Sequence, residues 1–389
     1  MGFRILTLNN ISPKGLERLP RDRYEVSTEV ADPDAILVRS ADMHSMKIPA
    51  SVRAVGRAGA GTNNIPVAAL SQRGIPVFTA PGANANAVKE LVLAGIFLAA
   101  RHICESWQFV RDLKGDAAAL EAAVEQGKKR FVGHELPGHT LGVVGLGAIG
   151  VEVANAAHLL GMHVLGYDPQ ITVQRAWQLS SGVEQALSLE DLFARSDVVT
   201  VHVPLADGTR SLVNGKRLQL MRKGATLLNF ARAAIVNEAD VLAALDSGNL
   251  AAYVCDFPTP QIKDHPRVVA LPHLGASTSE AEENSAMMVT DTVRDYLENG
   301  NIRHSVNFPE AALPRVPGTT RIAVANSNVP NMVGQISTSL AEAGLNIADL
   351  LNKSKGEVAY TLIDIDGQVP AGLIDRIAAI QGVLCARAV

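Results

Sequence analysis

Short apolar runs separated by turn residues recur along most of the chain. In the first part they predict strands at Phe3–Leu8, Ala35–Val38, Arg53–Val55 and Pro76–Phe78, with helical segments between them. This alternation is typical of a parallel sheet whose strands are joined by crossover helices. One long helix is then predicted from Ala87 to Leu113.

A second series of strands and helices begins at His139. Residues Thr140–Val144 form a continuous apolar run, as expected of a strand buried on both faces of a sheet. The series continues with strands at Val164–Tyr167, Val198–His202, Ala225–Asn229, Ala251–Cys255 and Val268–Leu271, and with helices at Ile149–Leu160, Asn237–Ser247 and Ser279–Asn299. A second parallel sheet covered by helices is therefore expected.

The last part of the chain has a different pattern. Residues 309–318 contain three prolines and predict a linker. Beyond it, alternating apolar and polar residues predict half-buried strands, and amphipathic stretches predict helices. The strands are expected at Arg321–Ala325, Val358–Ile365 and Val383–Arg387, and the helices at Pro330–Ala343 and Ala371–Ile380. The order β-α-β-β-α-β predicts a small sheet with helices on one face.

Composition excludes several classes of protein. A chain of 389 residues favours two or three domains, and a net charge of −4 gives no reason to expect nucleic acid or a membrane surface as partner. The longest apolar run, Leu91–Ala100, is about half of a membrane span. Cys104, Cys255 and Cys385 are too few and too far apart for a disulfide framework or a zinc site. We expect a cytoplasmic protein without a metal.

Three glycines follow the first strand of the second series. Gly145, Gly147 and Gly150 form G-x-G-x-x-G at the start of a predicted helix. The first glycine permits a tight turn, the second lets a pyrophosphate approach the backbone, and the third lets helix and strand pack closely. The helix N-terminus attracts the negative charge of the phosphates. The alternative is that the glycines serve only a strand-to-helix turn.

A carboxylate in the right place favours the cofactor interpretation. Asp168 ends the next predicted strand, 18 residues after Gly150, where an acidic residue would bind the hydroxyls of a ribose. The same carboxylate repels the additional phosphate of NADP, so the predicted cofactor is NAD.

Four segments together carry a resemblance to a known family. GVVGLGAIG (Gly142–Gly150), VTVHVPLADGTR (Val199–Arg210), LLNFARAAIVNE (Leu227–Glu238) and LPHLGAST (Leu271–Thr278) resemble the D-isomer-specific 2-hydroxyacid dehydrogenases, and the likeness runs in order through residues 1–308. VRSADM, GRAGAGTNNI and APGANANAVKE, which begin at Val38, Gly56 and Ala80, resemble the substrate half of the members that act on D-3-phosphoglycerate. The tail resembles an ACT regulatory domain.

The resemblance implies an α/β fold with two Rossmann-like, doubly wound parallel-sheet lobes and a C-terminal ACT domain. The substrate lobe would comprise residues 1–87 and 286–308, and the NAD lobe residues 88–285. The linker would be residues 309–318 and the ACT domain residues 319–389. The catalytic cleft would lie between the two lobes, and the family commonly dimerises through the NAD lobe, so a homodimer or homotetramer is expected.

The resemblance also implies the catalytic residues. Arg232 would bind the substrate carboxylate with its guanidinium fork. His273 would be the acid/base, because an unperturbed imidazole pKa of ~6.5 allows proton exchange near neutral pH. His202 is the main rival to His273, but its place in a strand segment favours a packing or cofactor-wall role.

Further site residues are implied by position in the family motifs. Those expected at the cofactor are Gly145, Gly147, Ala148, Ile149, Gly150, Asp168, His202, Val203, Pro204, Thr209, Phe230, Ala231, Asp256, His273, Gly275 and Ala276. Those expected at the substrate are Arg39, Ser40, Arg57, Gly59, Asn84 and Arg232. The pair Arg39 and Arg57 suits a phosphorylated substrate better than a plain hydroxy acid.

The chain departs from the family pattern in one place. The family has a glutamate after its Asp-x-Phe segment that partners the histidine, whereas here the sequence after Asp256 is Phe-Pro-Thr-Pro-Gln. Either Asp264, Glu282 or Glu283 replaces it, or the histidine acts alone. Without a carboxylate partner the histidine pKa would be lower, and the pH–rate profile would shift to lower pH. The chain also reads ARAA where ARGG is commoner, so the local turn can differ.

The tail raises a regulatory hypothesis. In ACT domains that it resembles, positions equivalent to Asn326, Asn328 and Asn346 bind serine, although some relatives have histidine at the first position. Alternatively, these asparagines only cap a helix and form turns, and an activity assay with millimolar serine separates the two.

Two rival functions remain for the whole chain, namely a glyoxylate or hydroxypyruvate reductase of the same family and a non-catalytic NAD-sensing module.

Overall fold

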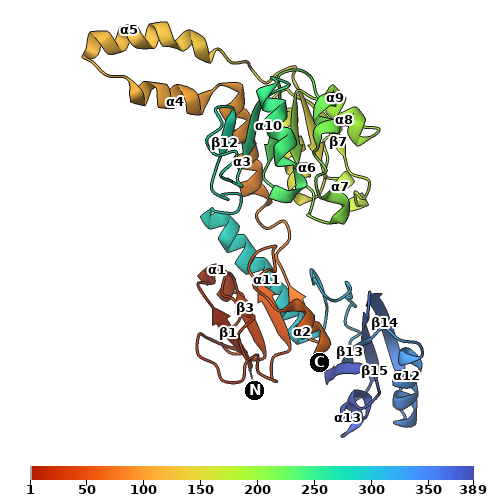
Figure 1. The fold of residues 1–389 in the computed structure, drawn as a ribbon. Helices are drawn as coiled ribbons and strands as arrows, with labels where there is room; N and C mark the ends of the chain where they lie inside the picture. Colours follow the sequence, from red (N-terminus) through yellow and green to blue (C-terminus); the bar gives the residue numbers. More distant parts are fainter. Residues whose placement is uncertain (1) are drawn as a thin grey trace. The chain divides into compact units, whose positions relative to one another are not determined.

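The computed structural model describes residues 2–389, which form two compact units (Figure 1). The inserted unit is Asn84–Thr278, and the split unit comprises the described residues up to Ala83 together with Ser279–Val389. The predicted lobe boundaries, 87/88 and 285/286, lie inside two helices, α3 (Ala85–Ala100) and α11 (Ser279–Asn299). The units divide where these helices begin.

The inserted unit is built on a seven-stranded parallel sheet with the order β12-β11-β10-β9-β6-β7-β8. Its strands are β6 (Thr140–Val144), β7 (His163–Tyr167), β8 (Val183–Gln185), β9 (Val198–Val201), β10 (Ala225–Asn229), β11 (Leu250–Cys255) and β12 (Val268–Ala270). Besides α3, its helices are α4 (Ile103–Asp112), α5 (Ala117–Gly127), α6 (Ala148–Leu159), α7 (Val173–Ala176), α8 (Leu189–Arg195), α9 (Gly215–Leu220) and α10 (Glu238–Asp246). Separate apolar clusters cover the two faces of the sheet, which explains the continuous apolar strands.

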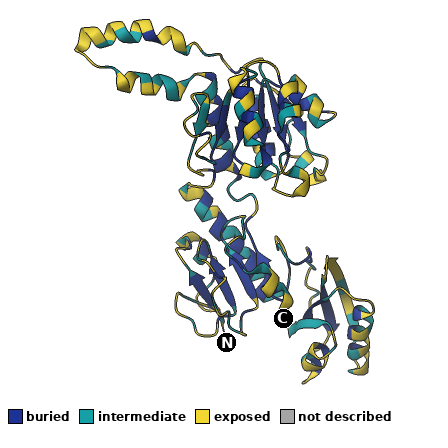
Figure 2. Ribbon diagram, viewed as in Figure 1, coloured by how far each residue is buried: buried dark blue, intermediate teal, exposed yellow. Residues whose placement is uncertain are grey.

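One predicted helix is wrong. The segment Ala87–Leu113 is not a single helix, because His102 adopts the left-handed conformation (φ 49°) and separates α3 from α4. A left-handed residue cannot continue a right-handed helix. Figures 1 and 2 show α4 and α5 projecting as an exposed pair from the body of the inserted unit.

The split unit contains a five-stranded parallel sheet with the order β2-β1-β3-β4-β5. Its strands are β1 (Phe3–Leu8), β2 (Tyr24–Ser27), β3 (Ala35–Val38), β4 (Ala54–Arg57) and β5 (Val77–Phe78), and two short helices, α1 (Pro13–Leu16) and α2 (Val67–Gln72), connect them. Helix α11 packs on β4, where a Cβ at Gly56 would lie 2.7 Å from Val293 Cγ2. This glycine therefore permits the close approach of helix and sheet.

The C-terminal part is a four-stranded antiparallel sheet with the order β14-β15-β13-β16. Its elements are β13 (Thr319–Ser327), α12 (Met332–Glu342), β14 (Ile347–Lys355), β15 (Val358–Asp366), α13 (Leu373–Ala378) and β16 (Val383–Ala388). One face packs on α12 and α13, and the other joins the apolar core around α11. This sheet is thus part of the split unit and has no apolar face exposed to water.

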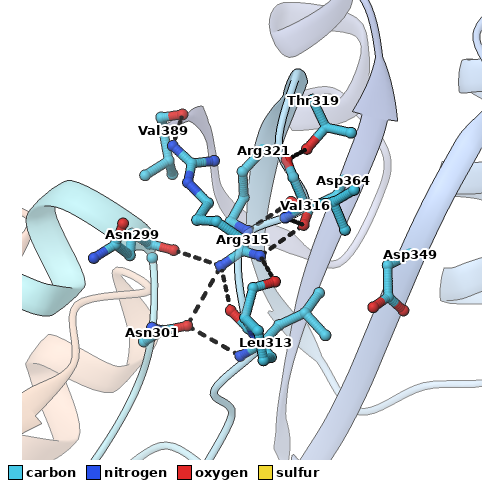
Figure 3. Close-up of polar contacts among 12 residues, drawn as sticks. Asn299, Asn301, Leu313, Arg315, Val316, Thr319, Arg321, Asp349, Asp364 and Val389 are labelled. Atoms are coloured by element: carbon cyan, nitrogen blue, oxygen red, sulfur yellow. Dashed lines mark hydrogen bonds and ion pairs between the residues drawn. The ribbon is translucent and has the colours of Figure 1, made fainter.

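A buried ion pair lies within the C-terminal sheet, and its arginine also bonds backbone carbonyls of the preceding segment of the split unit (Figure 3). Arg321 and Asp364 are both fully buried, and two parallel hydrogen bonds of 2.6 and 2.7 Å link them. The remaining guanidinium N–H groups donate to the carbonyls of Asn299, Leu313 and Pro314. A buried charge requires such complete pairing, because desolvation of a lone guanidinium is strongly unfavourable.

The same sheet satisfies the last carbonyls of α11. Arg387 donates to the carbonyls of Tyr296 and Leu297, and the Tyr360 hydroxyl donates to the carbonyl of Gly300 (2.7 Å). Helix C-termini leave carbonyls without partners and carry partial negative charge, so a guanidinium stabilises them in two ways.

Among the described residues, no helix has the length and apolarity needed to span a bilayer.

Candidate active site

Predicted site residues of the inserted unit lie at the carboxyl ends of its strands, on one edge of the sheet. Six of them follow six parallel strands by at most three residues, namely Gly145 (β6), Asp168 (β7), His202 (β9), Phe230 (β10), Asp256 (β11) and His273 (β12). The chain order reverses at β6, which lies between β7 and β9. Ligands of open α/β sheets bind at the carboxyl ends of the strands beside such a reversal.

The glycine turn has the geometry that a dinucleotide requires. Gly145 has φ +91°, and a Cβ there would lie 2.7 Å from the His202 carbonyl oxygen. A Cβ at Gly150 would lie 1.9 Å from the Gly145 carbonyl oxygen, so the start of α6 approaches the turn closely. At Gly147 nothing lies within 4 Å of the corresponding position. The residues therefore fit a pyrophosphate at the N-terminus of α6, where Ala148 and Ile149 form the first turn.

Asp168 is fixed beside this turn. Its Oδ2 accepts a hydrogen bond from the Leu146 amide and its Oδ1 one from the Gln170 amide, each 2.9 Å long. The carboxylate is half-buried and each oxygen still has a free lone pair. The carboxylate can therefore accept further hydrogen bonds beside the glycine turn.

Asn229 shapes the loop that carries Arg232. This fully buried residue ends β10, and its side chain accepts from the Ala231 amide (3.1 Å) and donates to the Arg232 carbonyl (3.0 Å). The Arg232 side chain is exposed and donates to the Ala231 carbonyl (2.6 Å). Sequence reasoning missed Asn229. Its signal is an amide residue that directly follows an apolar strand and precedes the arginine.

Asp256 and His273 lie close together. The His273 amide donates to the Asp256 carbonyl (3.1 Å), and the His273 ring lies 5.1 Å from the Phe257 ring. The Asp256 side chain is buried, its Oδ2 accepts from the Gly275 amide (3.4 Å), and its Oδ1 has no hydrogen-bond partner. Burial raises the pKa of Asp256, whereas the positive charges of His273 and Arg232 act in the opposite direction.

His202 has a different environment. Its Nε2 lies 2.9 Å from the Thr200 hydroxyl, and desolvation lowers the pKa of His202 to about 4. A histidine with this pKa is neutral at physiological pH and exchanges protons poorly there. This supports a packing or cofactor-wall role for His202 over a catalytic one.

The carboxylates considered as substitutes for the family glutamate have other partners. Asp264 pairs with Lys263, Glu282 with Arg39, and Glu283 with Lys14. Among the described residues of the inserted unit, Asp256 is the carboxylate whose pKa responds to the charge of His273. We see no carboxylate hydrogen-bonded to the His273 ring in the part of the chain that the structure describes.

The remaining predicted cofactor residues lie in three loops of the inserted unit. Thr209 donates to the Pro204 carbonyl (2.6 Å) and accepts from the Ala206 amide (2.8 Å), which closes the loop after β9. Val203 lies in the same loop, Phe230 and Ala231 follow β10, and Gly275 and Ala276 follow His273. Val203 and Ala231 pack against one apolar cluster of the sheet, and Phe230 belongs to the other. The Gly275 amide donates to Asp256, and Ala276 is exposed.

The split unit holds most of the predicted substrate residues. Arg39 and Ser40 follow β3 in a turn that Asn9 holds, because the Asn9 side chain accepts from the amides of Ser40 and Ala41. Asn64 donates to the Ala41 carbonyl from the other side (2.8 Å). Sequence reasoning missed both asparagines. The sequence signals are that Asn9 directly follows an apolar strand and that Asn64 lies in a polar loop. Asparagine also tolerates the left-handed backbone that Asn9 adopts (φ 66°).

Arg57 ends β4, and its guanidinium lies against Gly59. A Cβ at Gly59 would lie 2.5 Å from Arg57 Nη1, and Gly59 has φ +148°. A glycine is therefore needed here for the arginine to keep its position. Asn84 lies in the inserted unit, at the N-cap of α3, and makes no side-chain capping bond.

The regulatory asparagines lie in the C-terminal sheet and its loops. Asn326 is buried. Its Nδ2 donates to the Ser327 carbonyl (2.7 Å), but its Oδ1 has no partner. Asn328 donates to the Gly356 carbonyl (3.0 Å), and Asn346 donates to Asp366 (2.7 Å).

No cluster of three metal-binding side chains occurs among residues 2–389.

Comparison with known proteins agrees with this geometry. Residues 93–275 match the family "D-isomer specific 2-hydroxyacid dehydrogenase, NAD binding domain". The chain is 33% identical to a D-3-phosphoglycerate dehydrogenase of Haemophilus influenzae over 86% of its own length and 80% of that protein's. It is 32% identical to the enzyme of that name from Methanocaldococcus jannaschii, of which it spans 64%. An NAD⁺-bound 3-phosphoglycerate dehydrogenase structure from Entamoeba histolytica has 25% identity and a TM-score of 0.60, over 79% of this chain and 99% of that one.

Proposed function

The chain belongs to the D-isomer-specific 2-hydroxyacid dehydrogenases, which use NAD, and from this premise we propose that it oxidises D-3-phosphoglycerate to 3-phosphohydroxypyruvate, the first step of serine biosynthesis. The observation that carries this proposal is the presence of Arg232 and His273 at the strand ends of the inserted unit, together with Arg39 and Arg57 at the strand ends of the split unit. The first pair suits a hydroxy acid, and the second pair suits a phosphate.

The chemistry assigned to the inserted unit is proton transfer and anchoring. Arg232 binds the substrate carboxylate and holds the carbon that bears the hydroxyl. His273 accepts the hydroxyl proton as the carbon–oxygen double bond forms, and returns it in the reverse reaction. NAD, when bound, supplies the ring carbon that accepts the hydride. The bonds of Asn229 fix the backbone that carries Arg232, which supports a constant starting position for its side chain.

Two arginines are assigned to the phosphate of the same substrate. Arg39 lies on a turn fixed by two asparagines, and Arg57 lies against Gly59. A guanidinium grips phosphate oxygens bidentately, and a plain hydroxy acid offers nothing for two of them to bind. This supports D-3-phosphoglycerate over glyoxylate or hydroxypyruvate.

The function can be tested with purified protein, NAD and a panel of D-2-hydroxy acids, by following absorbance at 340 nm. We expect kcat/KM for D-3-phosphoglycerate to exceed that for D-glycerate by at least tenfold, because the phosphate contacts are lost in the latter. Faster reduction of glyoxylate or hydroxypyruvate would favour the related reductase. If no D-2-hydroxy acid is turned over although NAD binds, the chain is an NAD-sensing module.

Replacing Asp168 by asparagine should relax the cofactor preference. The carboxylate favours the ribose hydroxyls of NAD and repels the additional phosphate of NADP. We expect the ratio of kcat/KM for NAD to that for NADP to fall at least tenfold. Asp191, which is also acidic but lies on α8, provides the control D191N. An unchanged ratio in D168N would contradict the assigned role.

Two proposals concern partners. Helix α4 exposes Ile103, Trp107 and Val110 on one face, with 42, 59 and 52% of their surfaces accessible. Exposed apolar stripes of this kind usually mark interfaces, so we propose that α4 pairs with a second copy in a homodimer or homotetramer.

We also propose that the C-terminal sheet is an ACT domain that binds serine, since the buried Asn326 Oδ1 is free to accept a hydrogen bond.

A further inference from the structure

Arg39, a residue proposed above to bind the substrate phosphate, already has an anionic partner within the split unit. Its guanidinium donates to the carboxylate of Glu282 on the first turn of α11. The two side chains are 38 and 42% exposed, so a soluble anion can reach the pair. The hydrogen bond from Arg39 lowers the pKa of Glu282, and the carboxylate is therefore charged throughout the neutral range.

The position of Glu282 is held by the packing of α11. The helix buries Ala286, Val289 and Val293 on one face in the core of the split unit. Near its N-terminus Glu283 pairs with Lys14 (2.6 Å), and further along both carboxylate oxygens of Asp291 accept hydrogen bonds from Arg18. Both ends of the helix are thus attached to the same unit as Arg39, because its last carbonyls bind Arg387 of the C-terminal sheet. Only the side chain of Glu282 needs to move for the pair to open.

An anion that binds Arg39 must break this pair. A phosphate carries close to two negative charges at neutral pH and offers three acceptor oxygens, whereas Glu282 offers one charge and two oxygens. A substrate whose far end is uncharged has nothing to exchange for the carboxylate and leaves the pair intact. We propose that Glu282 is an internal competitor for the phosphate site at Arg39, which weakens the binding of phosphorylated substrates and leaves unphosphorylated ones unaffected. The proposal rests on the role given to Arg39 above.

The test compares Glu282→Gln with Glu283→Gln. Both changes remove one charge from neighbouring half-buried positions of α11 with little change in side-chain size, but Glu283 pairs with Lys14 rather than Arg39. Exposed ion pairs are worth up to about 1 kcal/mol, which corresponds to roughly a fivefold change in affinity. In E282Q we expect KM for D-3-phosphoglycerate to fall about two- to fivefold, with kcat within twofold of the wild type and KM for D-glycerate unchanged. E283Q should behave as the wild type.

A rise in KM for D-3-phosphoglycerate in E282Q would overturn the inference, because it would mean that Glu282 orients Arg39 for the substrate. Equal falls in KM for both substrates, or the same fall in E283Q, would overturn it as well. Calorimetric titration with inorganic phosphate separates this inference from the proposed function. Tighter phosphate binding in E282Q than in E283Q supports the competitor role whichever hydroxy acid is the substrate, and equal affinities in the two variants refute it.

Discussion

Replacing His273 by asparagine is expected to lower kcat by about 10²–10⁴, which is the usual contribution of a positioned acid/base. Asparagine keeps a polar side chain at this exposed position, so the fold and the Asp256–His273 backbone bond should persist. The loss should appear in kcat rather than in NAD affinity, which can be measured separately from the quenching of intrinsic protein fluorescence.

His163 is the matched control for this experiment. It is an exposed histidine at the start of β7, on the edge of the sheet opposite the strand ends that carry the site. H163N should retain wild-type kcat. If H273N kept more than a third of the wild-type kcat, His273 would not be the acid/base, and His202 would need to be reconsidered despite its low pKa.

Replacing Arg321 by methionine is expected to lower the free energy of unfolding of the split unit by about 3–5 kcal/mol. The change leaves the Asp364 carboxylate buried without its partner, and it also removes the donors to the carbonyls of Asn299, Leu313 and Pro314. Urea unfolding followed by circular dichroism measures the effect. R315M is the control, because Arg315 is an exposed neighbour that donates to the Val389 carbonyl.

A double variant tests the reason for the loss. Combining Arg321→Met with Asp364→Leu removes both charges, so the part of the loss caused by the unpaired carboxylate should return, while the three carbonyls still lack their donors. A single variant R321M that lost less than about 1 kcal/mol would show that the pair is not fully desolvated in solution.

The two parallel sheets could be predicted from the sequence because their signals are local. A strand buried on both faces must be continuously apolar, and the run Thr140–Val144 is therefore recognisable without any tertiary information. The glycine turn and Asp168 were predictable for the same reason, because their spacing along the chain reflects the geometry of one strand–turn–helix unit.

Most of the features that escaped prediction depend on residues distant in sequence, and one is a local backbone conformation. Nothing near His102 indicates that the backbone becomes left-handed there, since histidine is compatible with a helix interior. The pairing of Arg39 with Glu282 joins residues 243 positions apart, and the attachment of the C-terminal sheet to α11 depends on Arg321 and Arg387 meeting carbonyls that carry no sequence signature. Side chain–backbone bonds of this type are invisible until the fold is known.

The division of the chain into an inserted unit and a split unit has a consequence for synthesis. The sheet of the split unit is made by residues at the beginning of the chain, but the helix that covers it, α11, and the groups that cap that helix are translated last. While residues 84–278 are being translated, the strands of the split unit still lack the helix that covers one of their apolar faces. The inserted unit can therefore finish folding before the split unit does. The residues that are translated first therefore keep apolar surface exposed for the longest time during synthesis.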